Sequence, residues 1–402
     1  MHADVHKLGF DAKRLARIDD WLQRNIDIGR YTGCSVLIAR NGELAHFGAA
    51  GAASVERSLA YQRDTIVRIY SMTKMITTVG FMKLVEQGLI NLDTPLSDLL
   101  PEFSDCQALI KGARHIDQTK PVGSPNLQQV LTHTSGLTYG FNPGVLAAHY
   151  ADQKLDFGPQ SGSLASMCNR LAKQPLAFAP GANWQYSVGI DVIGRVIEVI
   201  DGRSLDLYLQ QEIFDPLDMV DTGFSVPLDQ IDRFADCYTK TQDAPILCTD
   251  RASESPYLAG EVETFSGGGG LVSTLDDYFR FGEMVRNYGR HGNDHLLSPR
   301  IVNFMRRNHL AGEISSMGPS SFAEMPMDGM GFGLGGAVVL DPARARTVGS
   351  PGDFGWGGMA STFFWTDPVE QLTCVFFTQL IPSSSYPNRT ELKALVHAAL
   401  IN

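Results

Sequence analysis

Strand-turn-strand patterns at both ends of this 402-residue chain limit its possible folds more than any other feature. Near the N-terminus, residues 34–40 (CSVLIAR) and 43–48 (ELAHFG) flank an Asn-Gly pair, which favours the primed two-residue turn of a β-hairpin. Near the C-terminus, residues 361–365 (STFFW) and 372–378 (LTCVFFT) flank a second predicted turn at residues 366–368. We therefore expect the two ends of the chain to build one domain.

Helical periodicity accompanies these strands. Residues 11–28 carry apolar side chains at three- and four-residue spacings, which predicts a helix with one apolar face, and a last helix is predicted at residues 389–400. The clearest buried helix is predicted at residues 69–87, where it ends at Gly88, a residue typical of helix C-termini.

Together these patterns predict an α/β (α+β) fold. The predicted α/β domain consists of residues 1–67 and 265–402, and a mainly helical domain of residues 68–264 is inserted between these two segments.

Composition excludes several functional classes. The formal net charge of -11 and the scarcity of Lys and Arg clusters argue against binding to nucleic acid or to an anionic membrane surface. The sequence contains no run of about 18 apolar residues, which a membrane-spanning helix would need. Residues 1–10 lack the pattern of a secretory signal, and the six cysteines form no CxxC pair, so we expect free thiols in a protein of the reducing cytoplasm.

Neither a metal nor a nucleotide cofactor is predicted. His291 and His295 lie four residues apart, but Gly and Asn between them suggest a loop, and no HExxH motif surrounds them. The glycine-rich runs at residues 266–270 (SGGGG) and 352–360 (GDFGWGGMA) are not followed by Lys-Ser or Lys-Thr, so both are interpreted as turns rather than phosphate-binding loops. We therefore expect no cofactor.

A Ser-x-x-Lys pattern offers a nucleophile. Ser71 and Lys74 lie three residues apart at the start of the predicted buried helix, so both side chains should share one helical face. A serine hydroxyl becomes a good nucleophile when a neighbouring base takes its proton, and a buried lysine amine can be that base. The motif alone is weak, because a solvated lysine is the ordinary interpretation, but the apolar flanks of this helix favour a buried one.

Further residues support this site. Tyr186, in the segment Trp184-Gln185-Tyr186-Ser187, opens a predicted helix and is a second candidate base, although a packing role is the commoner one for such a tyrosine. No Gly-x-Ser-x-Gly motif occurs, so no serine has the strained elbow of the α/β-hydrolases. For His133 a structural hydrogen bond is expected rather than catalysis.

These elements, in this order, resemble those of the serine β-lactamase and penicillin-binding protein superfamily, and most closely those of the class C-like carboxylesterases called family VIII. The resemblance spans almost the whole chain and includes Ser71-Met72-Thr73-Lys74, residues 180–187 and Gly355-Trp356-Gly357-Gly358. It implies an antiparallel sheet flanked by helices, beside a helical domain, with the active site between them.

The resemblance also implies roles for single residues. Ser71 would be the nucleophile, and Lys74 and Tyr186 would transfer protons. The backbone N–H groups of Ser71 and Met359 would form the oxyanion hole, and Trp356, Gly357 and Gly358 would contact the substrate.

Two departures from β-lactamases of this class suggest neutral esters as substrates. Tyr186-Ser187-Val188 stands where those enzymes have Tyr-x-Asn, so an amide that could bind an acylamino side chain is missing. Trp356-Gly357-Gly358 stands where they have Lys-Thr-Gly, so an indole replaces the cation that would hold a substrate carboxylate.

The predicted function is a cytoplasmic serine carboxylesterase that hydrolyses short-chain acyl esters through a Ser71 acyl-enzyme, with a small-molecule ester as its partner. Alternatives on the same site are a β-lactamase, a D-amino-acid amidase or peptidase, and an acyltransferase; a non-catalytic scaffold is the alternative from another class. Residues 139–166, rich in Gly, aromatic and polar residues, are predicted to form a pocket wall or a lid.

Overall fold

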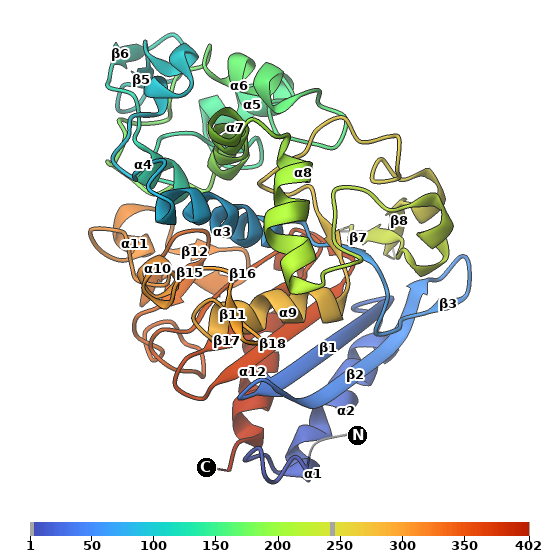
Figure 1. Cartoon of the computed structure of the whole chain (residues 1–402). Coiled ribbons are helices and arrows are strands. Elements are labelled where there is room, and N and C mark those ends of the chain that lie inside the picture. Colours follow the sequence, from blue (N-terminus) through green and yellow to red (C-terminus); the bar gives the residue numbers. More distant parts are fainter. Residues whose placement is uncertain (1–3, 242–245, 402) are drawn as a thin grey trace.

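An eight-stranded antiparallel sheet forms the centre of the computed structural model, which describes residues 4–241 and 246–401 (Figure 1). The strand order is β14-β15-β16-β17-β18-β1-β2-β3, so strands from the two ends of the chain meet where β1 pairs with β18. The strands are β1 (Gly33–Arg40), β2 (Glu43–Ser54), β3 (Leu59–Ala60), β14 (Met330–Phe332), β15 (Ala337–Val339), β16 (Phe354–Gly357), β17 (Phe363–Asp367) and β18 (Leu372–Thr378).

The N-terminal hairpin has the predicted turn, with Asn41 and Gly42 at positive φ values of 55° and 83°. Strand β2 is longer than predicted and ends at Ser54, because residues 49–51 pair with the start of β1 and residues 52–54 continue into the pairing with β3. The C-terminal turn was predicted wrongly. Residues 366 and 367 belong to β17, where they pair with β18, and the chain turns at residues 368–371 instead.

Helices cover both faces of the sheet. On one face lie α1 (Ala12–Leu15), α2 (Arg17–Asp27) and α12 (Asn388–Ala399), and here Trp21 packs edge-on against Phe376 of β18. On the other face lies α9 (Leu275–Arg286), whose Tyr278 packs against Phe364 of β17. The helix predicted at residues 11–28 is therefore two helices that meet at Ala16.

The remaining helices gather beyond α9, at the top of Figure 1. They are α3 (Thr73–Glu86), α4 (Leu127–Leu131), α5 (Val145–Asp152), α6 (Leu164–Leu171), α7 (Gly189–Asp201) and α8 (Leu205–Leu209), with α10 (Pro299–Met305) and α11 (Ile314–Met317) nearer the sheet. Small strand pairs also occur: β5 (Gln107–Leu109) with β6 (Thr119–Pro121), β7 (Cys237–Thr239) with β8 (Leu247–Asp250) and β19 (Leu380–Ile381), β4 (Val67–Arg68) with β9 (Val272–Ser273), β10 (Arg290–His291) with β11 (Asp294–His295), and β12 (Ser321–Phe322) with β13 (Met325–Pro326). The middle of the chain therefore contains strands as well as helices.

All strands of the large sheet come from the segments 1–67 and 265–402, which the sequence predicts as one domain. The exact division of the chain into two domains stays a prediction. Among the described residues, no helix is both long and apolar enough to cross a membrane.

Candidate active site

Ser71 and Lys74 are brought together as the sequence predicts. The helix starts later than expected, because residues 70–72 form a tight 3₁₀ turn before α3 begins at Thr73. Across this turn the Lys74 Nζ donates to the Ser71 Oγ at 3.3 Å. Tyr70, next to Ser71, has a positive φ of 43°, an uncommon conformation for a residue with a Cβ. The turn thus holds Ser71 at the wall of a cavity.

Lys74 is fully buried, and its side chain has three hydrogen-bond partners. Besides Ser71, the Nζ donates to the Gly268 carbonyl oxygen at 2.6 Å and to the Tyr139 hydroxyl at 2.9 Å. The charged form can donate to all three, and the neutral amine can donate to the Gly268 carbonyl and the Tyr139 hydroxyl while its lone pair faces the Ser71 hydroxyl. Because every partner is fixed by the fold, the amine has a defined position beside the nucleophile.

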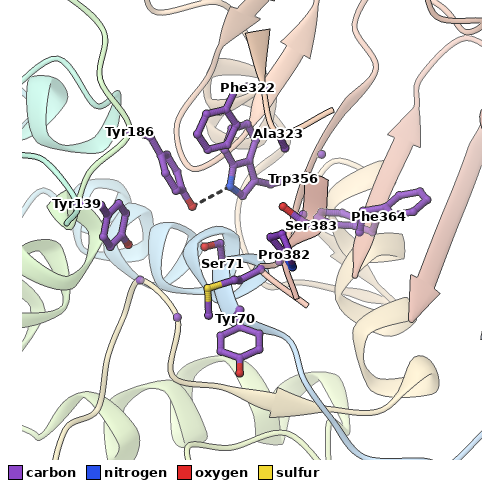
Figure 2. Close-up of a pocket in the computed structure, with 18 of the residues that line it drawn as sticks. Tyr70, Ser71, Tyr139, Tyr186, Phe322, Ala323, Trp356, Phe364, Pro382 and Ser383 are labelled. Carbon is purple, nitrogen blue, oxygen red and sulfur yellow. Dashed lines mark hydrogen bonds between the residues drawn. The ribbon is translucent and has the colours of Figure 1, made fainter. Parts of the chain in front are cut away.

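Tyr186 lies on the segment that leads into α7, and its ring faces the Lys74 amine. Its ring centroid is 4.7 Å from the Lys74 Nζ, and its hydroxyl accepts a hydrogen bond from the Trp356 Nε1 at 3.1 Å (Figure 2). Figure 2 shows Ser71 between Tyr139 and Tyr186 on one side and Trp356 and Ser383 on the other. The three predicted catalytic residues therefore share one site, with the Tyr186 hydroxyl oriented by an indole.

Asp191 supports this site from α7, and the sequence reasoning missed it. Its carboxylate accepts hydrogen bonds from the Ser266 hydroxyl and from the Gly268 N–H, so it fixes the turn whose carbonyl binds Lys74. A Cβ on Gly268 would lie 2.2 Å from the Asp191 carboxylate, so glycine is required there. Burial raises the pKa of Asp191 to about 6, although the nearby Lys74 opposes the rise.

Tyr139 also binds Lys74, although the sequence analysis places it only in a predicted pocket wall or lid, at residues 139–166. Burial raises the pKa of its hydroxyl well above the ordinary value, and the nearby Asp191 acts in the same direction. Tyr139 therefore stays protonated. The contact joins residues 65 positions apart, so no local spacing could reveal it.

Strand β16 brings the predicted oxyanion loop to Ser71. The sequence reasoning interpreted residues 352–360 as a turn, but residues 354–357 are a strand, because β15 and β17 pair with them on both sides. A Cβ on Gly358 would lie 2.4 Å from the Ile69 carbonyl oxygen, and one on Gly357 would lie 2.2 Å from the Arg389 guanidinium. Glycine therefore permits the close approach of this strand end to the segment that carries Ser71.

The cavity at Ser71 is large and mostly apolar. Its volume is about 810 Å³, and aromatic and Met side chains form much of its wall: Tyr70, Tyr139, Phe141, Phe157, Tyr186, Phe322, Met325, Met327, Met330, Trp356 and Met359. All four predicted contact residues, 356–359, line it. Val188, at the position of the missing amide, is fully buried and lies outside this lining.

His133 lies beneath Tyr186, with ring centroids 4.8 Å apart, and its Nδ1 shares a hydrogen bond with the Ser187 hydroxyl at 3.0 Å. Burial and the nearby Lys74 lower the pKa of His133 well below its ordinary value, so this ring is neutral at pH 7. Its place agrees with the predicted structural role.

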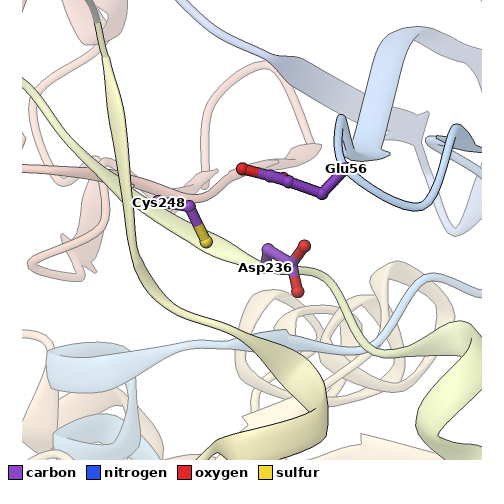
Figure 3. A group of neighbouring side chains, drawn as sticks. All are labelled: Glu56, Asp236 and Cys248. Atoms are coloured by element: carbon purple, nitrogen blue, oxygen red, sulfur yellow. The ribbon is translucent and has the colours of Figure 1, made fainter.

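Two clusters of side chains have metal-like spacing within the described residues. Glu56, Asp236 and Cys248 form the first (Figure 3), but the carboxylates already accept from other side chains, among them Tyr238 and Ser54, and none of the three lines the cavity. Asp353, Asp367 and His397 form the second cluster, in which Lys393 binds Asp353. His291 and His295 belong to neither cluster; they lie in a short hairpin, where a loop was predicted.

A model of the protein family described as Beta-lactamase matches residues 18–398 of this chain. The chain belongs to this family. The match covers the sheet, α3 and the whole cavity wall, so the family assignment and the geometry of the site concern the same part of the molecule.

Several relatives are described as esterases, hydrolases or acyltransferases. Esterase EstB of Burkholderia gladioli is 30% identical, with 93% of each chain covered. The solved structure described as EstCE1, a hydrolase with promiscuous acyltransferase activity, is 27% identical, covers 99% of each chain and has a TM-score of 0.78. Simvastatin synthase LovD from Aspergillus terreus is 25% identical, covers 97% of this chain and 98% of its own, and has a TM-score of 0.79.

These similarities confirm three expectations: the family, the β-lactamase-like fold, and the enzyme class of a serine hydrolase of the esterase type. The roles of the individual site residues stay predictions, and the distances within the site are what supports them.

Proposed function

We propose that this chain is a carboxylesterase that hydrolyses neutral, short-chain acyl esters through an acyl-enzyme on Ser71. The observation that carries the proposal is the direct contact between the Ser71 hydroxyl and the buried Lys74 amine, at the wall of a mostly apolar cavity. A nucleophile with an adjacent base is the arrangement that acyl transfer requires.

In the first step, the Ser71 Oγ attacks the ester carbonyl carbon while Lys74, as a neutral amine, takes the hydroxyl proton. The backbone N–H groups of Ser71 and Met359 stabilise the negative charge on the carbonyl oxygen. When the bond to the alcohol oxygen breaks, Tyr186 gives its proton to the departing alkoxide and receives the proton held by Lys74. The alcohol leaves neutral, and both Lys74 and Tyr186 return to their starting states.

In the second step, water replaces the alcohol and the same groups act in reverse. Tyr186 and Lys74 accept a proton from the attacking water, and the Ser71 oxygen regains a proton as the acid leaves. The Gly268 carbonyl and the Tyr139 hydroxyl keep the Lys74 amine in place during both steps.

The site disfavours β-lactams for two reasons. The fully buried Val188 offers no group to bind an acylamino side chain. Trp356 provides no positive charge for a carboxylate, and its N–H is already bound to Tyr186. A neutral ester without an acylamino side chain needs neither the amide nor the positive charge that this site lacks.

The test compares initial rates of hydrolysis for p-nitrophenyl butyrate and a chromogenic cephalosporin, with wild type and Ser71→Ala side by side. We expect fast ester hydrolysis that the substitution abolishes, with slow or absent cephalosporin hydrolysis. Faster cephalosporin hydrolysis would place the β-lactamase alternative first, and full esterase activity in Ser71→Ala would rule out the mechanism.

Acyl transfer to an alcohol is a second candidate, because the cavity is much larger than a short acyl group and its apolar wall favours alcohols over water. Adding a primary alcohol during p-nitrophenyl butyrate hydrolysis measures how the acyl-enzyme partitions. A new butyrate ester, formed in proportion to alcohol concentration, would support transfer, and butyric acid as the sole product would contradict it.

The proposal includes a cytoplasmic location and a small-molecule ester as the partner. All six cysteines are free, which suits a reducing compartment.

A further inference from the structure

Phe141 is a large apolar side chain that is exposed to solvent at the entrance of the cavity. It is 61% exposed and contributes to the cavity lining. Its ring stacks on that of Tyr139, with centroids 4.9 Å apart and an angle of 16° between the ring planes. The Phe141 ring therefore packs on one face of the Tyr139 ring, and its own exposed surface extends the aromatic wall outward from the site of Lys74.

The loop that carries Phe141 is firmly anchored. The Asn142 side-chain amide donates to the Tyr186 carbonyl oxygen at 2.7 Å and to the Thr138 hydroxyl at 3.1 Å. The Gly140 N–H donates to the Asp156 carboxylate at 2.9 Å. Because both neighbours of Phe141 are fixed, the exposed ring has a defined position before any ligand arrives.

The opposite wall of the cavity is also aromatic. The rings of Phe322 and Trp356 stack with centroids 5.6 Å apart and an interplanar angle of 18°. The Tyr186 ring joins the two walls, since its centroid is 5.2 Å from that of Tyr139 and 4.9 Å from that of Phe322. Ser71 lies at the base between these walls (Figure 2).

Proton transfer decides which half of an ester faces Phe141. The carbonyl oxygen must point to the N–H groups of Ser71 and Met359 at the end of β16. The alcohol oxygen must face the group that returns its proton, on the side of Tyr186 and Lys74. From that oxygen, the alcohol group extends past the edge of the Tyr139 ring toward the exposed ring of Phe141.

We infer that the stacked rings of Tyr139 and Phe141 form the alcohol-binding subsite, and that this subsite selects esters whose alcohol carries a flat ring. Phe141 is then a specificity-determining residue. This inference rests on the proposed esterase function and adds the class of alcohol to it.

The test uses two butyrate esters of primary alcohols with similar leaving ability, 2-naphthylmethyl butyrate and octyl butyrate. Release of each alcohol is followed by chromatography. We expect Phe141→Leu, which keeps an apolar side chain but removes the flat ring, to lower kcat/KM for the naphthylmethyl ester about fivefold. The change should appear in KM, with kcat and the octyl ester little affected, because the lost contact serves binding.

Two further variants complete the test. Phe141→Trp replaces one flat ring with another and should retain the preference for the naphthylmethyl ester. Phe304→Leu makes the same change at an aromatic residue that is 40% exposed and outside the cavity lining, and should alter neither rate.

An equal loss for both esters in Phe141→Leu, or no loss for either, would overturn the inference while leaving the esterase function intact. Wild type that hydrolyses neither ester, or a Ser71→Ala variant that still hydrolyses both, would overturn the proposed function and the inference with it.

Discussion

The Tyr186 hydroxyl receives a hydrogen bond from an indole N–H, so its lone pairs have a fixed direction. During proton transfer this oxygen gains negative charge, and both the Trp356 N–H and the nearby Lys74 would stabilise that charge. A residue that the sequence suggests as a simple apolar replacement for a lysine thus has a polar contact with the proton-transfer group.

Two substitutions separate these contributions. Tyr186→Phe removes the proton-transfer group, so kcat should fall by roughly two or more orders of magnitude. Trp356→Phe keeps a ring stacked on Phe322 but loses the donor, so kcat should fall by about tenfold. Steady-state kinetics with p-nitrophenyl butyrate over pH 6–10 measures both effects, and equal kcat values for wild type and Trp356→Phe would contradict the role of the indole.

Local spacing explains which site residues the sequence could reveal. Ser71 and Lys74 are three positions apart on one turn, so helix geometry alone predicts their contact. The contacts of Lys74 with Tyr139 and with Gly268 join distant segments, as does the support of Gly268 by Asp191. Such contacts depend on how the helices pack, which residue spacing does not encode.

Strand β16 is the element that links the sheet to the nucleophile. Two of its four residues, Phe-Gly-Trp-Gly, are glycines, which are depleted in strands, yet the segment pairs with β15 and β17. For this reason the sequence suggested a turn. Strands β14 and β15 also escaped prediction, because three residues each are too few to show alternation. The long strands β1, β17 and β18 carry clear patterns and were predicted.

Gly358→Ala tests the close approach at the end of β16. The added Cβ would lie 2.4 Å from the Ile69 carbonyl oxygen, so the loop that carries Met359 must shift. We expect kcat to fall by at least about tenfold, because a small displacement of oxyanion donors is sufficient for such a loss. Gly123→Ala is the matched control, since its Cβ would have no atom within 4 Å. Unchanged kcat in Gly358→Ala, with wild-type thermal stability, would contradict this account of the strand.

At the scale of the whole molecule, a buried group of charges connects α12 to the start of β16. Asp353 is 2% exposed, accepts a hydrogen bond from the Lys393 Nζ at 2.9 Å and lies beside the fully buried Asp367. Burial, with a further contribution from Asp367, raises the pKa of Asp353 to about 7 from the ordinary value of 3.8, although Lys393 opposes the rise. The folded protein therefore binds a proton here that the unfolded chain releases at lower pH.

This difference sets the sign of a pH effect on stability. Between about pH 4 and pH 7 the folded state binds more protons at this site, so the Asp353 contribution to stability falls as pH rises and is lowest above pH 7. Asp353→Asn imitates the protonated form at every pH. The difference in free energy of unfolding, Asp353→Asn minus wild type, should be larger at pH 8 than at pH 5 by more than about 1 kcal/mol. Urea unfolding at both pH values, with the exposed Asp294→Asn as control, measures the difference, and a difference independent of pH would contradict the raised pKa.

Covalent labelling tests most directly the claim that Ser71 forms the acyl-enzyme. Wild type, Ser71→Ala and Ser383→Ala, whose serine also lines the cavity, would be treated with a p-nitrophenyl alkylphosphonate and examined by intact mass and peptide mapping. We predict one phosphonyl group on Ser71 in wild type and in Ser383→Ala, loss of esterase activity in step with labelling, and no label in Ser71→Ala. A label on another residue, or stoichiometric labelling of Ser71→Ala, would contradict the proposed mechanism.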